Sequence, residues 1–131
     1  MLTLEDARRV IDAAEKKAEE IHCPVDIAVV DEGGNLKAHV RMDGAFIGSI
    51  NVSINKAYTA IAFQTETKDL APLAQSGQEL FGLSDAAGGR IVVFAGGVPL
   101  RRDGEIVGAV GVTTGTVDQD QQVAETGAAA F

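Results

Sequence analysis

Few side chains in this sequence could bind a metal. Imidazole and thiolate groups, and more rarely thioether or phenolate groups, are the axial ligands of protein-bound iron. Each such residue also has an ordinary structural role. A histidine at a helix end interacts with the helix dipole, a histidine on a strand face is solvated, and a lone cysteine packs as a small apolar residue. The candidates in this chain are His22, His39 and Cys23 and, more weakly, Met42 and Tyr58.

A second group of residues could hold an anionic ligand. Arg41 can donate two parallel hydrogen bonds to a carboxylate, and Lys56 supplies a point charge. The segment Thr113-Thr114-Gly115-Thr116 lies where a predicted strand passes into a predicted helix, so its hydroxyl and free backbone N–H groups suit a carboxylate or a phosphate. Two alternatives stay open: Lys56 is a solvated lysine, and Thr116 only caps its helix.

General acid–base chemistry has a narrower basis in this sequence. Two histidines offer little for an acid–base pair, and no spacing indicates a serine–histidine–aspartate triad. Asp31 and Asp43 are candidate bases for an enzyme that acts on a small carboxylate metabolite, with Lys56 as a further catalytic candidate. The 15 glycines include neither a Gly-x-Gly-x-x-Gly nor a Walker lysine motif, so no nucleotide-binding loop is predicted.

Caps and periodicity predict the elements that position these residues. Thr3 begins an amphipathic helix that ends before Pro24, and Thr116 with Gln119 forms a capping box at the start of the last helix. Alternation from Leu36 to Met42 predicts a strand that places Lys37, His39 and Arg41 on one face. The other elements are strands at 25–30, 90–94, 97–100 and 105–112 and helices at 46–63 and 67–74.

These elements predict an α/β (α+β) fold with a five-stranded antiparallel sheet, because an uninterrupted βαβ alternation is absent. Ile47, Ile50, Ile54 and Ile61 form the apolar stripe of the helix over 46–63. Lys56 lies about 180° from Ile47 and is therefore predicted to point away from this stripe and to be exposed.

Glycines have two kinds of predicted role. Asp103-Gly104 and the segment 31–35 predict tight hairpin turns, because Gly adopts positive φ freely. Gly96, Gly97, Gly108 and Gly111 fall within strand patterns, which indicates a bulge or a close approach by another backbone or a ligand.

Composition excludes several classes of protein. The chain has 131 residues, of which 46% are hydrophobic, and this predicts one globular domain over 1–131 that needs no disulfide or structural metal. A net charge of −8 argues against nucleic-acid and membrane partners. We expect a cytoplasmic protein, because no signal-peptide pattern or membrane-spanning run occurs. Both faces of the strand at 105–112 are apolar or glycine, which predicts a homo-oligomer.

Several motifs follow one another in a specific order. They are AVVDEGGNL (28–36), RMDGA (41–45), NKAYTA (55–60), LFGL (80–83), GGVPL (96–100), GAVGV (108–112) and DQD (118–120). In these motifs the chain resembles the GlcG/HbpS-like family of haem-degrading or haem-binding domains, which is related to the C-terminal domain of PduO-type cobalamin adenosyltransferases. The resemblance runs from about residue 2 to residue 130. At Thr113-Thr114-Gly115 the chain departs from the Ser-Gly-Gly that is usual in the family.

This resemblance implies a profilin-like, three-layer α/β/α fold, self-association into dimers and larger rings and, for some members, haem binding. None of the quoted motifs is tied to the axial ligand, so His22 and His39 both stay candidates. The leading hypothesis is a small oligomeric protein that binds a small anionic ligand, with haem as the best single choice. Arg41, Lys56 and Arg90 could then hold the propionates.

The expected site lies between the Lys37/His39/Arg41 strand face and the Thr113–Thr116 turn, with Lys56 contributed by a neighbouring subunit. In the alternative hypothesis, the chain is an enzyme acting on a small carboxylate metabolite. Arg41 and Lys56 would hold the carboxylate there, and Thr113 and Thr114 would contact the reacting group. A regulatory oligomer without a ligand is a third hypothesis.

Overall fold

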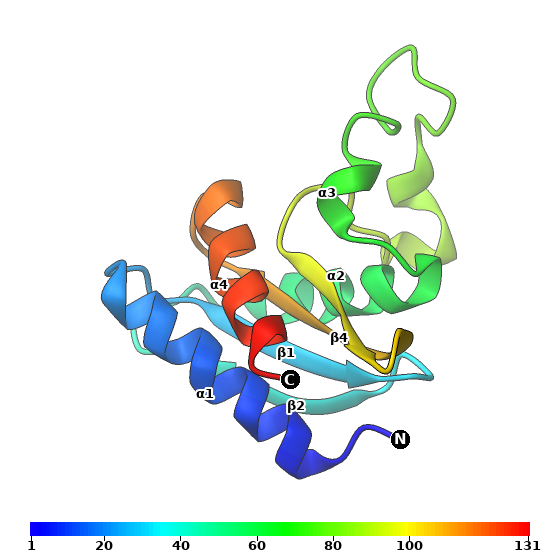
Figure 1. The fold of residues 1–131 in the computed structure, drawn as a ribbon. Coiled ribbons are helices and arrows are strands. Elements are labelled where there is room, and N and C mark those ends of the chain that lie inside the picture. Colours follow the sequence, from blue (N-terminus) through cyan, green and yellow to red (C-terminus); the bar gives the residue numbers. More distant parts are fainter.

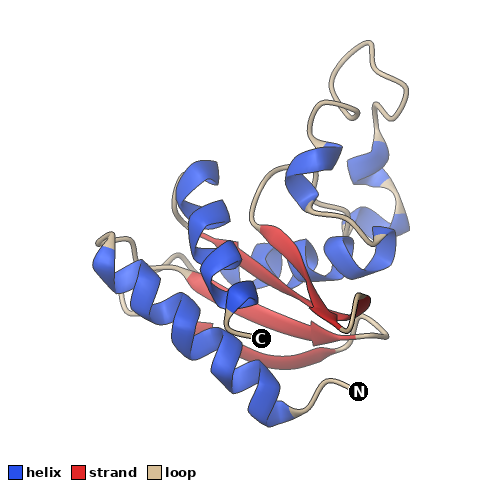
Figure 2. Ribbon diagram, in the orientation of Figure 1, coloured by secondary structure: helices blue, strands red, loops and turns tan.

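The computed structural model describes residues 1–131. Its elements are α1 (Leu4–Glu20), β1 (Asp26–Asp31), β2 (Leu36–Arg41), α2 (Ser49–Phe63), α3 (Thr67–Leu70), β3 (Gly97–Arg102), β4 (Glu105–Thr113) and α4 (Val117–Ala129), with 3-10 turns at Leu83–Asp85 and Ala87–Gly89 (Figure 2). The predicted caps are confirmed, because Thr3 and Thr116 each accept a backbone N–H from the third helical residue within a capping box. These local signals set where the first and last helices begin.

The strands form one antiparallel sheet in the order β2-β1-β4-β3. The prediction of a five-stranded sheet is therefore wrong: the sheet has four strands, and the segment at 90–94 does not join it. Ile91 and Val92 of this segment are buried, but Val92 N–H donates to Thr59 Oγ1 of α2 at 3.0 Å instead of to a neighbouring strand. The β-branched run thus packs against a helix and adds no strand to the sheet.

Helices cover both faces of the sheet and give three layers. Figure 1 shows α1 and α4 side by side on the near face and α2 on the far face. The larger apolar core, of 16 residues, lies between α1, α4 and the sheet, and a smaller one of 5 residues lies under α2. Both faces of β4 are thus buried within one chain, so the pattern that predicted a homo-oligomer is explained without a second copy.

The connection between α3 and β3 extends away from the sheet (Figure 1). The helix predicted over 67–74 is shorter in the structure and ends at Leu70. Residues 71–90 beyond it are mostly exposed and contain only the two 3-10 turns. None of the helices combines the length and apolar character that crossing a bilayer requires.

Both predicted hairpins are confirmed. At the first, Asp31 Oδ1 accepts the N–H groups of Gly33 at 2.9 Å and Asn35 at 3.0 Å. At the second, Asp103 and Gly104 both have positive φ, 51° and 83°, and join β3 to β4. Positive φ at both central residues is the geometry of a tight two-residue turn that follows the twist of the strands.

Helix α2 lies unusually close to the sheet. A Cβ atom at Gly111 would come within 2.6 Å of the Ala57 nitrogen, and one at Gly97 within 2.5 Å of the Lys56 carbonyl oxygen. These strand glycines therefore mark a close approach by another backbone, one of the alternatives that the sequence left open. The residues that α2 buries are mostly small: Ser49, Ser53, Ala57, Thr59 and Ala60, together with Lys56 and Ile61.

The apolar stripe predicted to face the core lies mainly at the rim of this contact. Ile47 is 75% exposed, and Ile50 and Ile54 are half-buried. Lys56 does point away from these residues, but that direction leads into the protein, where its side chain is fully buried. The prediction of an exposed Lys56 is therefore wrong.

Candidate functional site

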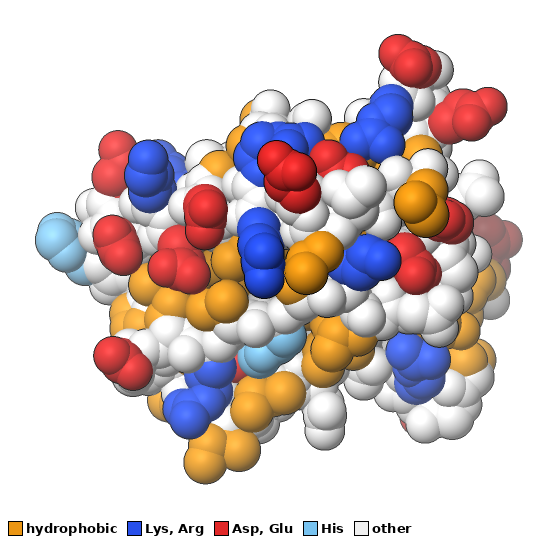
Figure 3. Space-filling model, turned by 90° about the horizontal axis from the view of Figure 1, so that it is seen from below, with side chains coloured by type: hydrophobic (Ala, Val, Ile, Leu, Met, Phe, Trp, Pro, Cys, Tyr) orange, Lys and Arg blue, Asp and Glu red, His pale blue; other side chains and the backbone are white.

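The sheet register brings the predicted strand face and the predicted turn together. Asp26, the first residue of β1, pairs with Arg41 at the end of β2 and with Thr113 at the end of β4. Arg41 and the Thr113–Thr116 turn therefore lie on either side of Asp26 at one end of the sheet. Figure 3 shows the molecule from below, where acidic, basic and apolar side chains are interspersed and histidine side chains reach the surface.

A surface groove of about 470 Å³ opens at this end of the sheet. Its walls come from the segment after α1, the segment after β2 and the start of α4. One wall carries an exposed aromatic ring, and the other carries hydroxyl and backbone N–H groups. The lining residues are His22, Cys23, Pro24, Gly44, Phe46, Thr114, Gly115, Thr116 and Gln119.

The Thr113–Thr116 turn is held by hydrogen bonds to two buried carboxylates. Thr114 Oγ1 donates to Asp26 Oδ2 at 3.2 Å, and Gly115 N–H donates to Asp120 Oδ1 at 3.0 Å. Thr114 has a φ of 114°, a conformation that β-branched residues rarely adopt. Because Asp120 already accepts one N–H of this turn, the anion-binding capacity predicted from the sequence is partly used within the chain.

His22 is the accessible imidazole of the groove. It follows the C-terminus of α1 with a φ of 53°, and its side chain is exposed. Its neighbour Cys23 is buried, and the thiol donates to Gln119 Oε1 at 3.6 Å. Burial raises the pKa of the Cys23 thiol, with a further contribution from Asp120. Cys23 therefore stays protonated at neutral pH, which favours His22 as the metal ligand of this pair.

His39 has a different environment. Its Nε2 lies 3.5 Å from Asp26 Oδ1, and the two side chains are 17% and 0% exposed. Neither of these atoms makes a hydrogen bond. Burial lowers the pKa of His39 and raises that of Asp26, against the attraction between the two groups. The imidazole nitrogen thus faces a buried carboxylate instead of the groove.

Lys56 lies behind the turn, inside the protein. Its Nζ donates to Val112 O at 2.7 Å and to Asp120 Oδ2 at 3.1 Å, and it lies 5.0 Å from the centre of the Phe94 ring. Burial lowers the pKa of Lys56 and raises that of Asp120, and each shift is opposed by the partner's charge. Lys56 is therefore not placed to reach a ligand on a neighbouring subunit.

The other predicted residues lie apart from the groove or at its rim. Asp31 is at the opposite end of β1 from Asp26 and accepts turn hydrogen bonds. Asp43 is exposed beside the groove residue Gly44. The Arg90 guanidinium carbon lies 3.6 Å from the centre of the Tyr58 ring, so both side chains are engaged with each other. Met42 is half-buried against the larger core.

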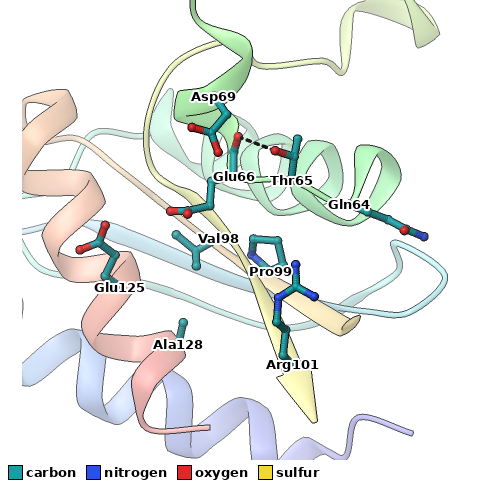
Figure 4. A pocket seen from close by; sticks show the side chains of 9 residues that line it. All are labelled: Gln64, Thr65, Glu66, Asp69, Val98, Pro99, Arg101, Glu125 and Ala128. Carbon is teal, nitrogen blue, oxygen red and sulfur yellow. Dashed lines mark hydrogen bonds between the residues drawn. The ribbon is translucent and has the colours of Figure 1, made fainter. Parts of the chain in front are cut away.

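A second hollow, of about 410 Å³, lies between α3, α4 and β3 (Figure 4). Glu66, Asp69 and Glu125 lie along one side of it and Arg101 at the other end. Gln121 Nε2 donates to Glu66 Oε1 at 2.7 Å and to Glu125 Oε1 at 2.9 Å, so its amide bridges two of these carboxylates. No predicted site residue lines this hollow, and it contains no imidazole or thiol.

Comparison with known proteins identifies the relatives of this fold and groove. The chain matches the family model "Haem degrading protein HbpS-like" over residues 2–129. It belongs to this HbpS-like family. The chain is 46% identical over 125 residues to an uncharacterized 15.0 kDa protein from the dhaT–dhaS intergenic region of Citrobacter freundii, covering 95% of this chain and 88% of the relative. It is 36% identical to protein GlcG of Escherichia coli, covering 86% and 81%.

Another relative is much longer than this chain. The chain is 37% identical over 130 residues to the corrinoid adenosyltransferase PduO of Citrobacter freundii, which covers 99% of this chain but only 39% of that protein. The match therefore concerns one part of PduO.

Solved structures that are similar to this chain share the whole fold. The Klebsiella pneumoniae protein ORFY has a TM-score of 0.96 at 42% identity, covering 98% of this chain and 89% of that chain. The PduOC–heme complex has a TM-score of 0.95 at 35% identity, covering 100% and 95%. HbpS has a TM-score of 0.89 at 36% identity, covering 100% and 90%. The resemblance stated from the sequence motifs is thereby confirmed.

Asp26 and Asp120 are the site residues that sequence reasoning missed. Asp26 is the first residue of a strand that is otherwise buried and apolar up to Val30. A carboxylate at that position indicates a buried polar group with a partner, and the sequence could have shown this. Asp120 lies in the first turn of α4, where an acidic residue is already explained by the helix dipole. Its contact with Gly115 is local, five residues away, but its contact with Lys56 depends on the tertiary fold.

Proposed function

We propose that this HbpS-like chain binds haem in the groove at the end of the sheet, with His22 as the axial ligand. The observation that carries the proposal is the contrast between the two histidines. His22 is exposed and lines the groove, whereas His39 Nε2 is buried against Asp26. Haem occurs in the PduOC–heme complex, which has the same fold at 35% identity.

The groove residues fit the chemical requirements of haem. The porphyrin needs an apolar surface, and the groove is lined by Pro24 and by Phe46, which is 67% exposed. Propionates need hydrogen-bond donors or cations, and Thr116 of the facing wall has a hydroxyl that accepts the Gln119 N–H and keeps its own hydrogen free to donate. When bound, haem supplies an iron centre that takes small ligands and exchanges electrons.

Arg41 is the cation that we assign to a propionate. Its side chain is exposed at the end of β2, and Nη1 donates to Ala45 O at 3.3 Å, next to Phe46. Arg41 itself lines a neighbouring hollow with Glu15, Glu19 and Asp43, and its contact with Ala45 O links the guanidinium to the segment that carries Phe46. The planar fork can then bind a carboxylate with two parallel hydrogen bonds.

Titration of the purified protein with hemin tests this function. We expect a Soret band that saturates at one haem per chain. His22→Ala should weaken binding by about tenfold or more and shift the band, because the axial donor is lost. His39→Asn is the matched control and should bind hemin as the wild type does. Absence of a saturable Soret band in the wild type would refute haem binding and favour the carboxylate-metabolite alternative.

We also propose that the chain forms a homo-oligomer. Phe46 and Ile47 are 67% and 75% exposed beside the groove, and a haem lying on this surface would leave one face in water. A second copy packed on these residues would cover both. Light scattering at micromolar concentration should therefore return a multiple of 13.6 kDa. A mass of one chain would contradict the proposal, and Phe46→Ser with Ile47→Ser should shift the mass toward one chain.

A further inference from the structure

A buried ion pair lies directly behind the turn that lines the groove. Asp120 Oδ1 accepts the Gly115 N–H at 3.0 Å, and its Oδ2 accepts a hydrogen bond from Lys56 Nζ at 3.1 Å. The Asp120 and Lys56 side chains are 2% and 0% exposed. Lys56 Nζ also donates to Val112 O at 2.7 Å, just before the turn. One carboxylate therefore links α2, α4 and the backbone of the turn.

The backbone of the Thr113–Thr116 turn is tightly packed against the Lys56–Asp120 pair. A Cβ atom at Gly115 would come within 2.6 Å of Cys23 Sγ and 3.0 Å of Asp120 Oδ1, so the backbone is packed between the two side chains. Its neighbour Thr114 is held at a φ of 114°. A non-glycine residue keeps such a conformation only where surrounding contacts determine it. Here those contacts are the hydrogen bonds to Asp26 and Asp120.

Stability alone does not account for a lysine and an aspartate at these positions. Desolvating two charges opposes their attraction, and well-packed apolar residues of similar volume often stabilise a fold as much or more. An apolar pair would leave the Gly115 N–H without its acceptor, however. What the charged pair adds is a carboxylate whose orientation is fixed at one oxygen by Lys56, so that the other oxygen faces Gly115.

We propose that Lys56 and Asp120 are positioning residues that orient the Thr114–Thr116 wall of the groove toward its ligand through the Gly115 N–H. This inference rests on haem binding in the groove. Lys56 orients Asp120 and Asp120 fixes the Gly115 amide, and the turn that carries the Thr116 hydroxyl is thereby held in one position. The Thr114 hydroxyl donates to Asp26 and holds the turn from its other side. Neither charged group contacts the ligand.

Two double variants separate this role from a general effect on the fold. The amide variant, Lys56→Met with Asp120→Asn, removes both charges but keeps an oxygen that can accept the Gly115 N–H. The leucine variant, Lys56→Met with Asp120→Leu, removes the charges and the acceptor. We expect the amide variant to bind hemin less tightly than the wild type but more tightly than the leucine variant, because it keeps the acceptor for the Gly115 N–H and loses the Lys56 contact that orients this acceptor. The leucine variant should bind roughly tenfold more weakly than the wild type, the equivalent of about one hydrogen bond between the turn and the ligand.

Amide hydrogen exchange at Gly115 provides a readout that needs no haem. In the wild-type protein this amide should exchange only with global unfolding, and in the amide variant it should stay protected. In the leucine variant it should exchange at least tenfold faster than the β1 amides. Leu100→Ala, in the core away from the turn, lowers stability and should speed the exchange of Gly115 and of the β1 amides equally, so that their ratio and the hemin affinity of the folded protein stay unchanged.

The outcomes are distinguishable. The wild type could show no Soret band while the Gly115 amide exchanges slowly in the wild type and fast in the leucine variant. That result would refute haem binding and would still show that Asp120 holds the turn. Equal hemin affinity in the folded amide and leucine variants would overturn the positioning role. If the leucine variant does not fold, the wild-type measurement decides: a Gly115 amide that exchanges as fast as that of exposed Gly104 would overturn the proposal.

Discussion

Gly111 in β4 lies directly beneath the backbone of Ser53 in α2, so a Cβ atom at position 111 would collide with the Ser53 carbonyl oxygen. It would also come within 2.6 Å of the Ala57 nitrogen. Helix and sheet therefore touch through their backbones along this line. This close contact explains why α2 buries small side chains, and it brings the aliphatic stem of Lys56 across the sheet to Asp120.

We predict that Gly111→Ala destabilises the protein by roughly 1–3 kcal/mol, because α2 must move away from β4 to admit the methyl group. Gly48→Ala is the control. A Cβ atom at Gly48 would meet no atom within 4 Å, and its φ of −59° suits alanine. That change should leave stability unchanged or raise it by about 0.4–1 kcal/mol. Urea denaturation measures both, and equal midpoints for the two variants would contradict the close contact.

Lys56→Met alone should be more damaging than the paired substitutions. It leaves the Asp120 carboxylate buried at 2% exposure without its cation. Breaking a buried pair in this way typically destabilises a protein by about 3–5 kcal/mol. Lys68→Met removes an exposed ion pair to Glu66 at 3.9 Å and should change stability by less than about 1 kcal/mol. A Lys56→Met protein as stable as Lys68→Met would show that Asp120 is not charged in the fold.

Local signals predicted most of the fold. The caps at Thr3 and Thr116 and the turn at Asp103-Gly104 depend on residues within one or two turns of chain, and each is found where the sequence places it. The segment at 90–94 has the composition of a strand, but its backbone N–H at Val92 meets the Thr59 hydroxyl. Such a contact between distant segments leaves no local pattern.

The candidate site was predictable only in part. Arg41 and the Thr113–Thr116 turn are both recognisable by residue type, and the register of β1 brings them together. Helical periodicity correctly separated Lys56 from the isoleucine stripe. Periodicity wrongly predicted that Lys56 is exposed, because it assumes that the most apolar face of a helix faces the core. In α2 the small residues face the sheet, since the glycines of β3 and β4 admit the helix backbone there.

The hairpin turn at Asp103-Gly104 should be independent of ligand binding. Gly104 has a φ of 83°, which a β-branched residue adopts only with strain. Gly104→Val should therefore lower the free energy of unfolding by about 1 kcal/mol or more, with the hemin affinity of the folded protein unchanged. Asp103→Asn should be tolerated, because Asn also adopts positive φ. Selective loss of hemin affinity at full stability would place this turn in the site.

Stability should fall in mild acid because of His39. Burial is the main cause that lowers the pKa of His39 from 6.5, Arg41 adds to it, and Asp26 opposes it. Below pH 6.5 the unfolded chain therefore takes up a proton that the folded protein does not, and stability is lost as pH falls from 6.5 toward the lower pKa of the folded state. His39→Gln should lose less stability than the wild type as the pH is lowered through this range. Parallel pH profiles would contradict this assignment.

Arg41 provides the most direct test of the ligand's position. In the sheet, Arg41 lies across Asp26 from Thr113, and its guanidinium donates to Ala45 O, one residue before Phe46. If it binds a propionate through its planar fork, Arg41→Ala should weaken hemin binding by about tenfold or more, as loss of a charge-assisted pair does.

Arg41→Lys should give an intermediate affinity, since it keeps the charge but loses the second parallel hydrogen bond. Arg101→Ala removes an exposed arginine from the other hollow and should leave hemin affinity unchanged. Raising the salt concentration should weaken the wild type more than Arg41→Ala, because a partly exposed ion pair is screened by salt. Wild-type affinity in Arg41→Ala, with folding intact, would place the ligand away from the end of β2.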